Sequence, residues 1–144
     1  MIQLLDVNVL IALAWPNHVH HGAARSWFAR WRATGWATCA MTEAGFVRVS
    51  CNPSAVKQSV TPAEAIALLS RLRQLESHTY WAMDRSITAL PSAILARIQG
   101  HRQITDAMLV ALAMQYGGQL ATFDAGLADL LTTEARRSIR TIPV

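Results

Sequence analysis

Four acidic residues of this chain occupy positions at which a strand should end or a helix should begin: Asp6, Glu43, Asp106 and Asp124. The chain holds only 9 aspartates and glutamates in 144 residues, so this placement does not follow from abundant acid. In an open parallel α/β sheet, the ends of the strands and the starts of the following helices line one edge. Carboxylates gathered there repel one another unless a cation lies among them. The pattern therefore predicts a site for Mg²⁺ or Mn²⁺, which prefer oxygen ligands.

The elements that position these acids are indicated by short apolar runs and by the amphipathic segments between them. Strands are predicted over residues 2–6, 36–39, 78–81, 119–123 and 139–142. Helices are predicted over residues 9–14, 20–34, 42–50, 62–75, 91–98, 106–116 and 127–131. Asn8 is expected to cap the first helix and Thr105 the helix at 106–116. Because strands alternate with helices, we expect one α/β domain over residues 1–144, with a central parallel sheet of about four to five strands flanked by helices.

Within this framework, Asp6 and Asp124 close apolar strands, whereas Glu43 and Asp106 begin helices, whose N-termini favour negative charge. A divalent cation held by these carboxylates would polarise a phosphoryl oxygen and lower the pKa of water. The alternative interpretation is that each acid only caps a helix or a turn.

Two neutral residues close to these acids, Asn8 and Thr122, offer oxygen atoms that could orient the carboxylates. Three further acids, Asp84, Asp129 and Glu134, lie in polar surroundings and are interpreted as surface or capping residues.

The ordered set of motifs resembles the PIN-domain ribonucleases, and most of all the VapC toxins of bacterial toxin–antitoxin modules. The resemblance covers nearly the whole chain, and the order and spacing of its segments carry it rather than any single one. The segments are Asp6-Val7-Asn8-Val9-Leu10-Ile11-Ala12-Leu13, Thr42-Glu43, Thr105-Asp106-Ala107 with Ala111-Leu112-Ala113, and Leu120-Ala121-Thr122-Phe123-Asp124.

This resemblance implies a PIN-like fold and a Mg²⁺- or Mn²⁺-dependent endoribonuclease that leaves 5′-phosphate and 3′-hydroxyl ends. It implies that Asp6, Asp106 and Asp124 bind the metal directly, and that Glu43 binds the metal or orients water. Thr122 matches the family's hydroxyl position two residues before the last acid. The partners it implies are an RNA substrate, a VapB-like antitoxin and a second copy of the chain in a homodimer.

The region of the first acid departs from the family pattern. Many members carry a small hydroxyl there, where this chain has Val7-Asn8, so Asn8 is the candidate substitute. Asp129 lies five residues after the last acid and is not counted as a ligand.

The formal net charge of +4 is compatible with a polyanionic substrate, although it also keeps a protein in solution without implying a partner. Arg48, Arg85 and Arg102 lie nearest in sequence to the acidic elements, so they are the candidates for RNA contacts.

Two further groups of residues allow two interpretations each. A histidine cluster precedes the second helix and is either a solvated turn or a transition-metal site; it comprises His18, His20 and His21. An apolar stripe on that helix is either a core face or a groove contact for a partner helix; it comprises Ala24, Trp27, Phe28 and Trp31.

The two cysteines, Cys39 and Cys51, form no CxxC pair and no zinc-site spacing, so reduced thiols in a cytoplasmic protein are expected. Residues 1–15 are apolar but include Asp6 and Asn8, which indicates a buried strand and helix rather than a signal peptide or a membrane span.

Two other functions fit parts of the pattern. A PIN-like binding module without catalysis could keep the acids for stability or for gripping a basic peptide. A phosphatase could use Asp6 as a covalent nucleophile, but such chemistry usually needs a second acid where Asn8 stands, and the only lysine is Lys57.

Overall fold

The computed structural model describes all 144 residues, and its centre is a single five-stranded sheet. Every neighbouring pair of strands is parallel, and the spatial order is β3-β2-β1-β4-β5. The strands are β1 (Gln3–Leu5), β2 (Trp36–Cys39), β3 (His78–Trp81), β4 (Gln119–Thr122) and β5 (Ile139–Thr141). The predicted parallel α/β sheet is confirmed, and all five predicted strands form within it.

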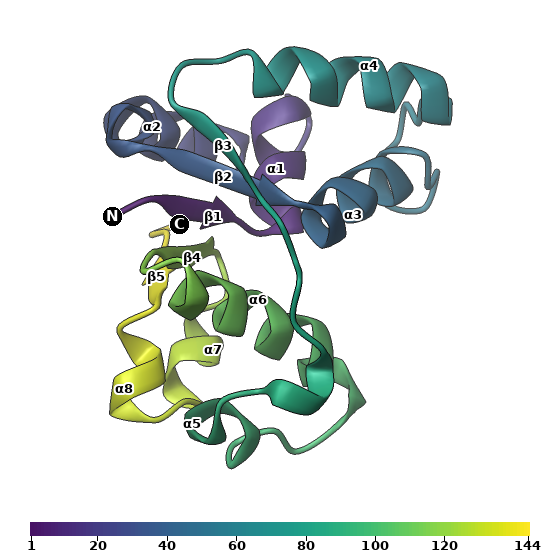
Figure 1. The fold of residues 1–144 in the computed structure, drawn as a ribbon. Coiled ribbons are helices and arrows are strands. Elements are labelled where there is room, and N and C mark those ends of the chain that lie inside the picture. The colour runs from purple at the N-terminus through teal and green to yellow at the C-terminus, as the bar shows by residue number, and fades with distance from the viewer.

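Helices cover both faces of the sheet, so the molecule has three layers (Figure 1). One face carries α1 (Val7–Ala14), α2 (His21–Trp31), α3 (Ala40–Ser50) and α4 (Pro62–Arg73). The other face carries α5 (Ser92–Leu95), α6 (Ile104–Gln115), α7 (Ala125–Asp129) and α8 (Thr133–Arg136). Short 3₁₀ turns lie at Arg32–Thr34, Ile87–Ala89 and His101–Gln103.

Alternation along the strands produces two apolar cores, because successive side chains point to opposite faces of a sheet. Leu4 and Leu120 belong to the core under α5–α8, whereas their neighbours Leu5 and Ala121 belong to the core under α1–α4.

The aromatic stripe of α2 is mostly a core face. Ala24, Trp27 and Phe28 are buried, and Phe28 packs edge-on against Trp36 of β2. Trp31 is only half-buried, at the end of the stripe.

The strand order creates a switch point between β1 and β4. From β1 the chain moves outward through β2 to β3, and it then returns to place β4 on the opposite side of β1. At such a point the connections leave in opposite directions, and a crevice opens beyond the carboxyl ends of the two strands. Asp6 directly follows β1 and Asp124 follows β4, so both acids lie at this crevice.

One tight approach explains the glycine that leads into β4. A Cβ added at Gly118 would lie 2.5 Å from the Ile2 carbonyl oxygen and 2.6 Å from a ring carbon of Trp81. Only glycine lets the chain turn from α6 into the centre of the sheet at this spacing.

Two predicted caps are wrong. Helix α1 begins at Val7, and Asp6 caps it by accepting a hydrogen bond from the Val7 backbone N–H, which leaves Asn8 exposed in the first turn. Helix α6 begins at Ile104 because the 3₁₀ turn at His101–Gln103 runs directly into it, so Thr105 lies inside the helix and caps nothing.

Other boundaries also differ from the prediction. Helix α3 begins at Ala40, two residues before the expected start, because Cys39 and Thr42 form a reciprocal cap. Helix α5 is shorter than the predicted 91–98, α7 begins at Ala125, and the short α8 was not predicted.

Candidate functional site

The end of β1 and the end of β4 are joined by one hydroxyl group. Thr122 donates a hydrogen bond to Asp6 Oδ2 at 2.9 Å and accepts one from the backbone N–H of Asp124 at 3.1 Å. The other carboxylate oxygen of Asp6 accepts from the Val7 N–H at 2.8 Å. Asp6 is therefore held in a single orientation by two donors, and the predicted orienting role of Thr122 agrees with this geometry.

Asp124 begins the next helix and stays open to solvent. Its Oδ1 accepts the backbone N–H of Gly126 at 2.9 Å, so the carboxylate caps α7. The remaining oxygen has no partner within the protein and is available to a ligand.

Asp106 lies in the first turn of α6 and is half-buried. Burial, together with the nearby charges of Asp6 and Asp124, raises its pKa to about 6. Burial also raises the pKa of Asp6, where Asp124 again adds to the rise and the two hydrogen bonds oppose it. The three aspartates thus share one site and repel one another there.

Glu43 lies in the first turn of α3 as predicted, and its carboxylate contacts a separate set of polar side chains. Thr38 donates a hydrogen bond to Glu43 Oε2, and the Arg73 guanidinium lies 3.5 Å from Oε1. His78 Nε2 is 2.8 Å from the Thr38 hydroxyl. Because that hydroxyl has one proton and gives it to Glu43, His78 must donate through Nε2.

This second polar cluster comprises Thr38, Glu43, Arg73 and His78. Burial and the Arg73 charge lower the pKa of His78, which outweighs the opposite effect of Glu43 and keeps the imidazole neutral. The charge of Glu43 is therefore balanced by Arg73, a side chain that is 42% exposed, while the three aspartates have no cation.

The donor atoms of the three aspartates suit Mg²⁺ or Mn²⁺, because every one is a carboxylate oxygen. As they stand, no group of three or more histidine, cysteine, aspartate or glutamate side chains is placed to hold a metal ion. Binding at this site therefore requires side-chain rotation, which Asp106 permits because no hydrogen bond fixes its carboxylate.

The three arginines predicted to contact RNA lie on three different segments of the chain. All three are exposed: Arg48 lies in the last turn of α3, Arg85 follows β3, and Arg102 lies in the 3₁₀ turn before α6. Arg102 is the one nearest in sequence to a site residue, Asp106.

The sequence did not predict two groups of contacts beside the acids: the partners of Glu43, and the contact between the histidine cluster and Phe123. Thr38, Arg73 and His78 surround Glu43, and their only signal was a threonine inside an otherwise apolar strand. The predicted histidine cluster forms the turn that begins α2, and two of its rings meet Phe123, the residue before Asp124.

Two further predictions concern the cysteine thiols and the absence of a membrane span. Both cysteines are free. No helix combines the length and the apolar character that a membrane crossing needs.

Comparison with known proteins identifies the family of this chain. The sequence model of the PIN domain matches residues 4–130. Ribonuclease VapC39 of Mycobacterium tuberculosis is 52% identical over 129 residues, which cover 90% of this chain and 93% of that protein. Ribonuclease VapC38 of the same organism is 42% identical over 143 residues, which cover 99% of each.

Solved structures share the fold at low identity. The crystal structure of Mycobacterium tuberculosis VapC20, described as a sarcin-ricin loop cleaving toxin, superposes with a TM-score of 0.62 at 14% identity over 84% of this chain and 87% of that one. FitAcB from Neisseria gonorrhoeae gives 0.60 at 18% identity over 96% of each chain. On the extent of the family match and the identity to these relatives, the chain belongs to the PIN-domain family, among the VapC ribonucleases.

Proposed function

We propose that this protein is a metal-dependent endoribonuclease and the toxin of a VapBC-type toxin–antitoxin pair. The observation that carries the proposal is the meeting of Asp6, Asp106 and Asp124 at the switch point, where their mutual repulsion helps to raise the pKa of Asp106 to about 6. A group of carboxylates that repel one another is unfavourable by itself and becomes favourable when a cation is bound.

The three aspartates would hold Mg²⁺ or Mn²⁺. Their carboxylates differ in how firmly hydrogen bonds fix them. Asp6 is fixed by Thr122 and Val7, Asp124 is fixed on one oxygen by the start of α7, and Asp106 is free to turn toward the ion. The chemistry that such an ion supplies is neutralisation of charge on the phosphodiester and a lower pKa for water.

The role proposed for Glu43 requires its carboxylate to leave its present hydrogen-bond and ion-pair partners. Acting on the metal or on an attacking water requires its carboxylate to leave Thr38 and Arg73 and turn toward Asp6. Arg73 is 42% exposed, but the Glu43 side chain is only 16% exposed, so breaking its contacts costs free energy that the binding of a cation would have to offset.

The substrate and partners follow from the relatives and from charge. The VapC relatives are named ribonucleases, and one solved relative is FitAB bound to a DNA fragment. We propose single-stranded RNA as the substrate, a VapB-like antitoxin as the inhibitor and a homodimer as the assembly. Arg48, Arg85 and Arg102 are exposed and remain candidates for contacts with RNA phosphates.

The experiment that tests the proposal is induced expression of the wild type and of Asp6→Asn, with new RNA 5′ ends mapped in both. Growth arrest with discrete new ends only in the wild type is expected. Purified protein should lose cleavage in EDTA and in Asp106→Asn. Full cleavage by either variant would contradict the assignment.

A PIN-like module without catalysis gives a different outcome in the same experiment: tight binding of RNA or antitoxin with no metal-dependent cleavage. The phosphatase alternative has no support in the structure, since Asn8 is exposed and Lys57 lies on an exposed loop.

A further inference from the structure

Three aromatic rings meet immediately beside the carboxylate site. Phe123 stands between Thr122 and Asp124, and its ring centroid lies 5.0 Å from that of His20 and 6.5 Å from that of His18. The planes of His18 and Phe123 are inclined by only 21°. The His18 and His20 centroids are 5.7 Å apart, so the three rings form one continuous aromatic patch.

The turn that carries the two histidines is built to hold their rings in place. The His20 backbone N–H donates to His18 Nδ1 at 3.0 Å, which fixes the His18 ring across the turn. His21 begins α2, and its Nδ1 lies 2.7 Å from the Ala12 carbonyl oxygen, which ties α2 to α1. His18 and His20 are half-buried rather than enclosed in the core, so their rings remain partly open to solvent.

Nothing in the proposed chemistry uses these rings. Neither histidine forms an ion pair with an acid, and the cluster is not placed to hold a metal ion. Burial and the neighbouring histidines lower the pKa of His18, so at neutral pH this ring is an uncharged aromatic surface.

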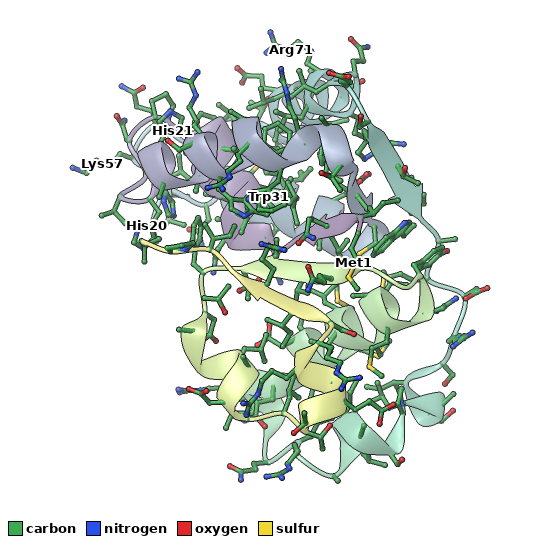
Figure 2. The ribbon with its side chains drawn as sticks, turned by 90° about the vertical axis from the view of Figure 1, so that its left-hand side faces the viewer. Met1, His20, His21, Trp31, Lys57 and Arg71 are labelled. Carbon is green, nitrogen blue, oxygen red and sulfur yellow. The ribbon has the colours of Figure 1, made fainter.

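A groove continues from the patch. It has a volume of about 680 Å³, is open to solvent, and is lined by His18 together with Trp15 and Lys57. Figure 2 shows His20, His21 and Lys57 on the same flank of the molecule. Lys57 is the only lysine of the chain, and its exposed loop places a positive charge at the far side of the groove.

From this arrangement we infer that His18, His20 and Phe123 form a stacking platform for an unpaired nucleobase next to the scissile phosphate, and that the groove carries the flanking RNA backbone toward Lys57. The inference rests on the proposed nuclease function. Unpaired bases stack on aromatic faces whatever their sequence, whereas the bases of a duplex are already stacked. Single-stranded RNA is favoured over a protein partner because Phe123 directly precedes Asp124, one of the three aspartates at which the phosphodiester would be cut.

The test uses two paired variants that separate the rings from the turn. In His18→Asn/His20→Leu both rings are lost, but the introduced asparagine keeps an oxygen that can accept the same backbone N–H. In His20→Phe both rings are kept, and His18 can still accept the backbone N–H of residue 20 through Nδ1. Val19→Ala is the matched control, because Val19 lies between the two histidines and is 86% exposed. Thermal unfolding checks that each variant folds.

Binding is measured in the Asp106→Asn background, which prevents cleavage, with a single-stranded RNA dodecamer carrying 2-aminopurine at successive positions. The ring-free variant should bind about tenfold more weakly and lose the fluorescence quenching that stacking produces. The phenylalanine variant and Val19→Ala should stay within about twofold of the parent. Lys57→Ala should weaken binding and reduce its dependence on salt, as expected when one phosphate contact is lost.

The outcomes separate this inference from the nuclease proposal. If the ring-free variant binds RNA as tightly as the parent, or if the phenylalanine variant loses binding equally, the stacking platform is wrong. If the wild type cuts no RNA with Mg²⁺ or Mn²⁺ yet binds it in a ring-dependent way, the nuclease proposal fails and the platform stands as an RNA-binding surface.

Discussion

Replacing Asp106 with asparagine should stabilise the metal-free protein while abolishing cleavage. The pKa of Asp106 in the fold is about 6, well above its ordinary value of 3.8. Between these two values the folded state binds more protons than the unfolded state, so stability falls as pH rises through this window. Above pH 6 the stabilising effect of the proton is gone, and the ionised carboxylate remains next to Asp6 and Asp124.

The size of the effect follows from the same pKa. A rise from 3.8 to about 6 corresponds to about 3 kcal/mol, since one pKa unit is about 1.4 kcal/mol. Asp106 is half-buried, and water reaches part of its side chain, so screening reduces the expected gain to about 1–2 kcal/mol. For a domain of this length that gain raises Tm by about 2–8 °C.

The assay is urea unfolding of the wild type and of Asp106→Asn in EDTA, at several pH values between 4 and 8. The wild type should lose stability from pH 4 to pH 6 more steeply than the variant. Asp129→Asn removes the same charge from an exposed position and controls for net charge. Saturating Mn²⁺ should stabilise the wild type more than Asp106→Asn, because a cation removes the repulsion.

One result would refute this reasoning. If Asp106→Asn is no more stable than Asp129→Asn in EDTA at pH 7.5, burial and the charges of Asp6 and Asp124 do not disfavour the ionised Asp106 carboxylate enough to matter.

Three other substitutions probe the surroundings of the site. Thr122→Val removes the hydrogen-bond donor to Asp6. Loss of a hydrogen bond to a charged group should weaken Mn²⁺ binding about tenfold or more, measured by calorimetric titration. Unchanged affinity would exclude an orienting role for Thr122. Arg73→Met leaves the mostly buried Glu43 carboxylate without its cation and should destabilise the protein by about 1–3 kcal/mol, while lowering the Mn²⁺ concentration needed for half-maximal cleavage. A loss of cleavage would show that the pair is required as it stands. Gly118→Ala should destabilise the protein by about 1–3 kcal/mol in urea, because its Cβ has no room beside the first strand; wild-type stability would mean that the strand can shift.

Much of this fold was predictable because apolar alternation and strand–helix order are local features. The sequence placed Asp6 and Asp124 at strand ends, and the rule that parallel strands end at one edge brought them together. Thr122 lies beside Asp6 because the register that pairs Leu5 with Ala121 brings the next residue of each segment alongside the other.

The direction of Glu43 could not be predicted in this way. Its carboxylate is held by Thr38 of β2 and by Arg73 of α4, and Arg73 lies far along the chain from Glu43. No local pattern in the sequence indicates a contact over that separation.

The contact of His18 and His20 with Phe123 could not be predicted for a different reason. His18 and His20 are separated from Phe123 by about a hundred residues, and no periodicity in either segment indicates contact with the other. The fold brings the turn between α1 and α2 against Phe123, the residue that follows β4.

The charge of the three aspartates gives a reason for Glu43 to have partners of its own. Asp6, Asp106 and Asp124 carry a formal charge of −3 when ionised, and one divalent cation would reduce it to −1. Bringing Glu43 into the same site would restore a further negative charge and demand a second cation or a proton. Arg73 and Thr38 already give that carboxylate a cation and a hydrogen-bond donor. The position of Glu43 should therefore be linked to the number of bound ions: beside Arg73 with one, and turned toward Asp6 with two.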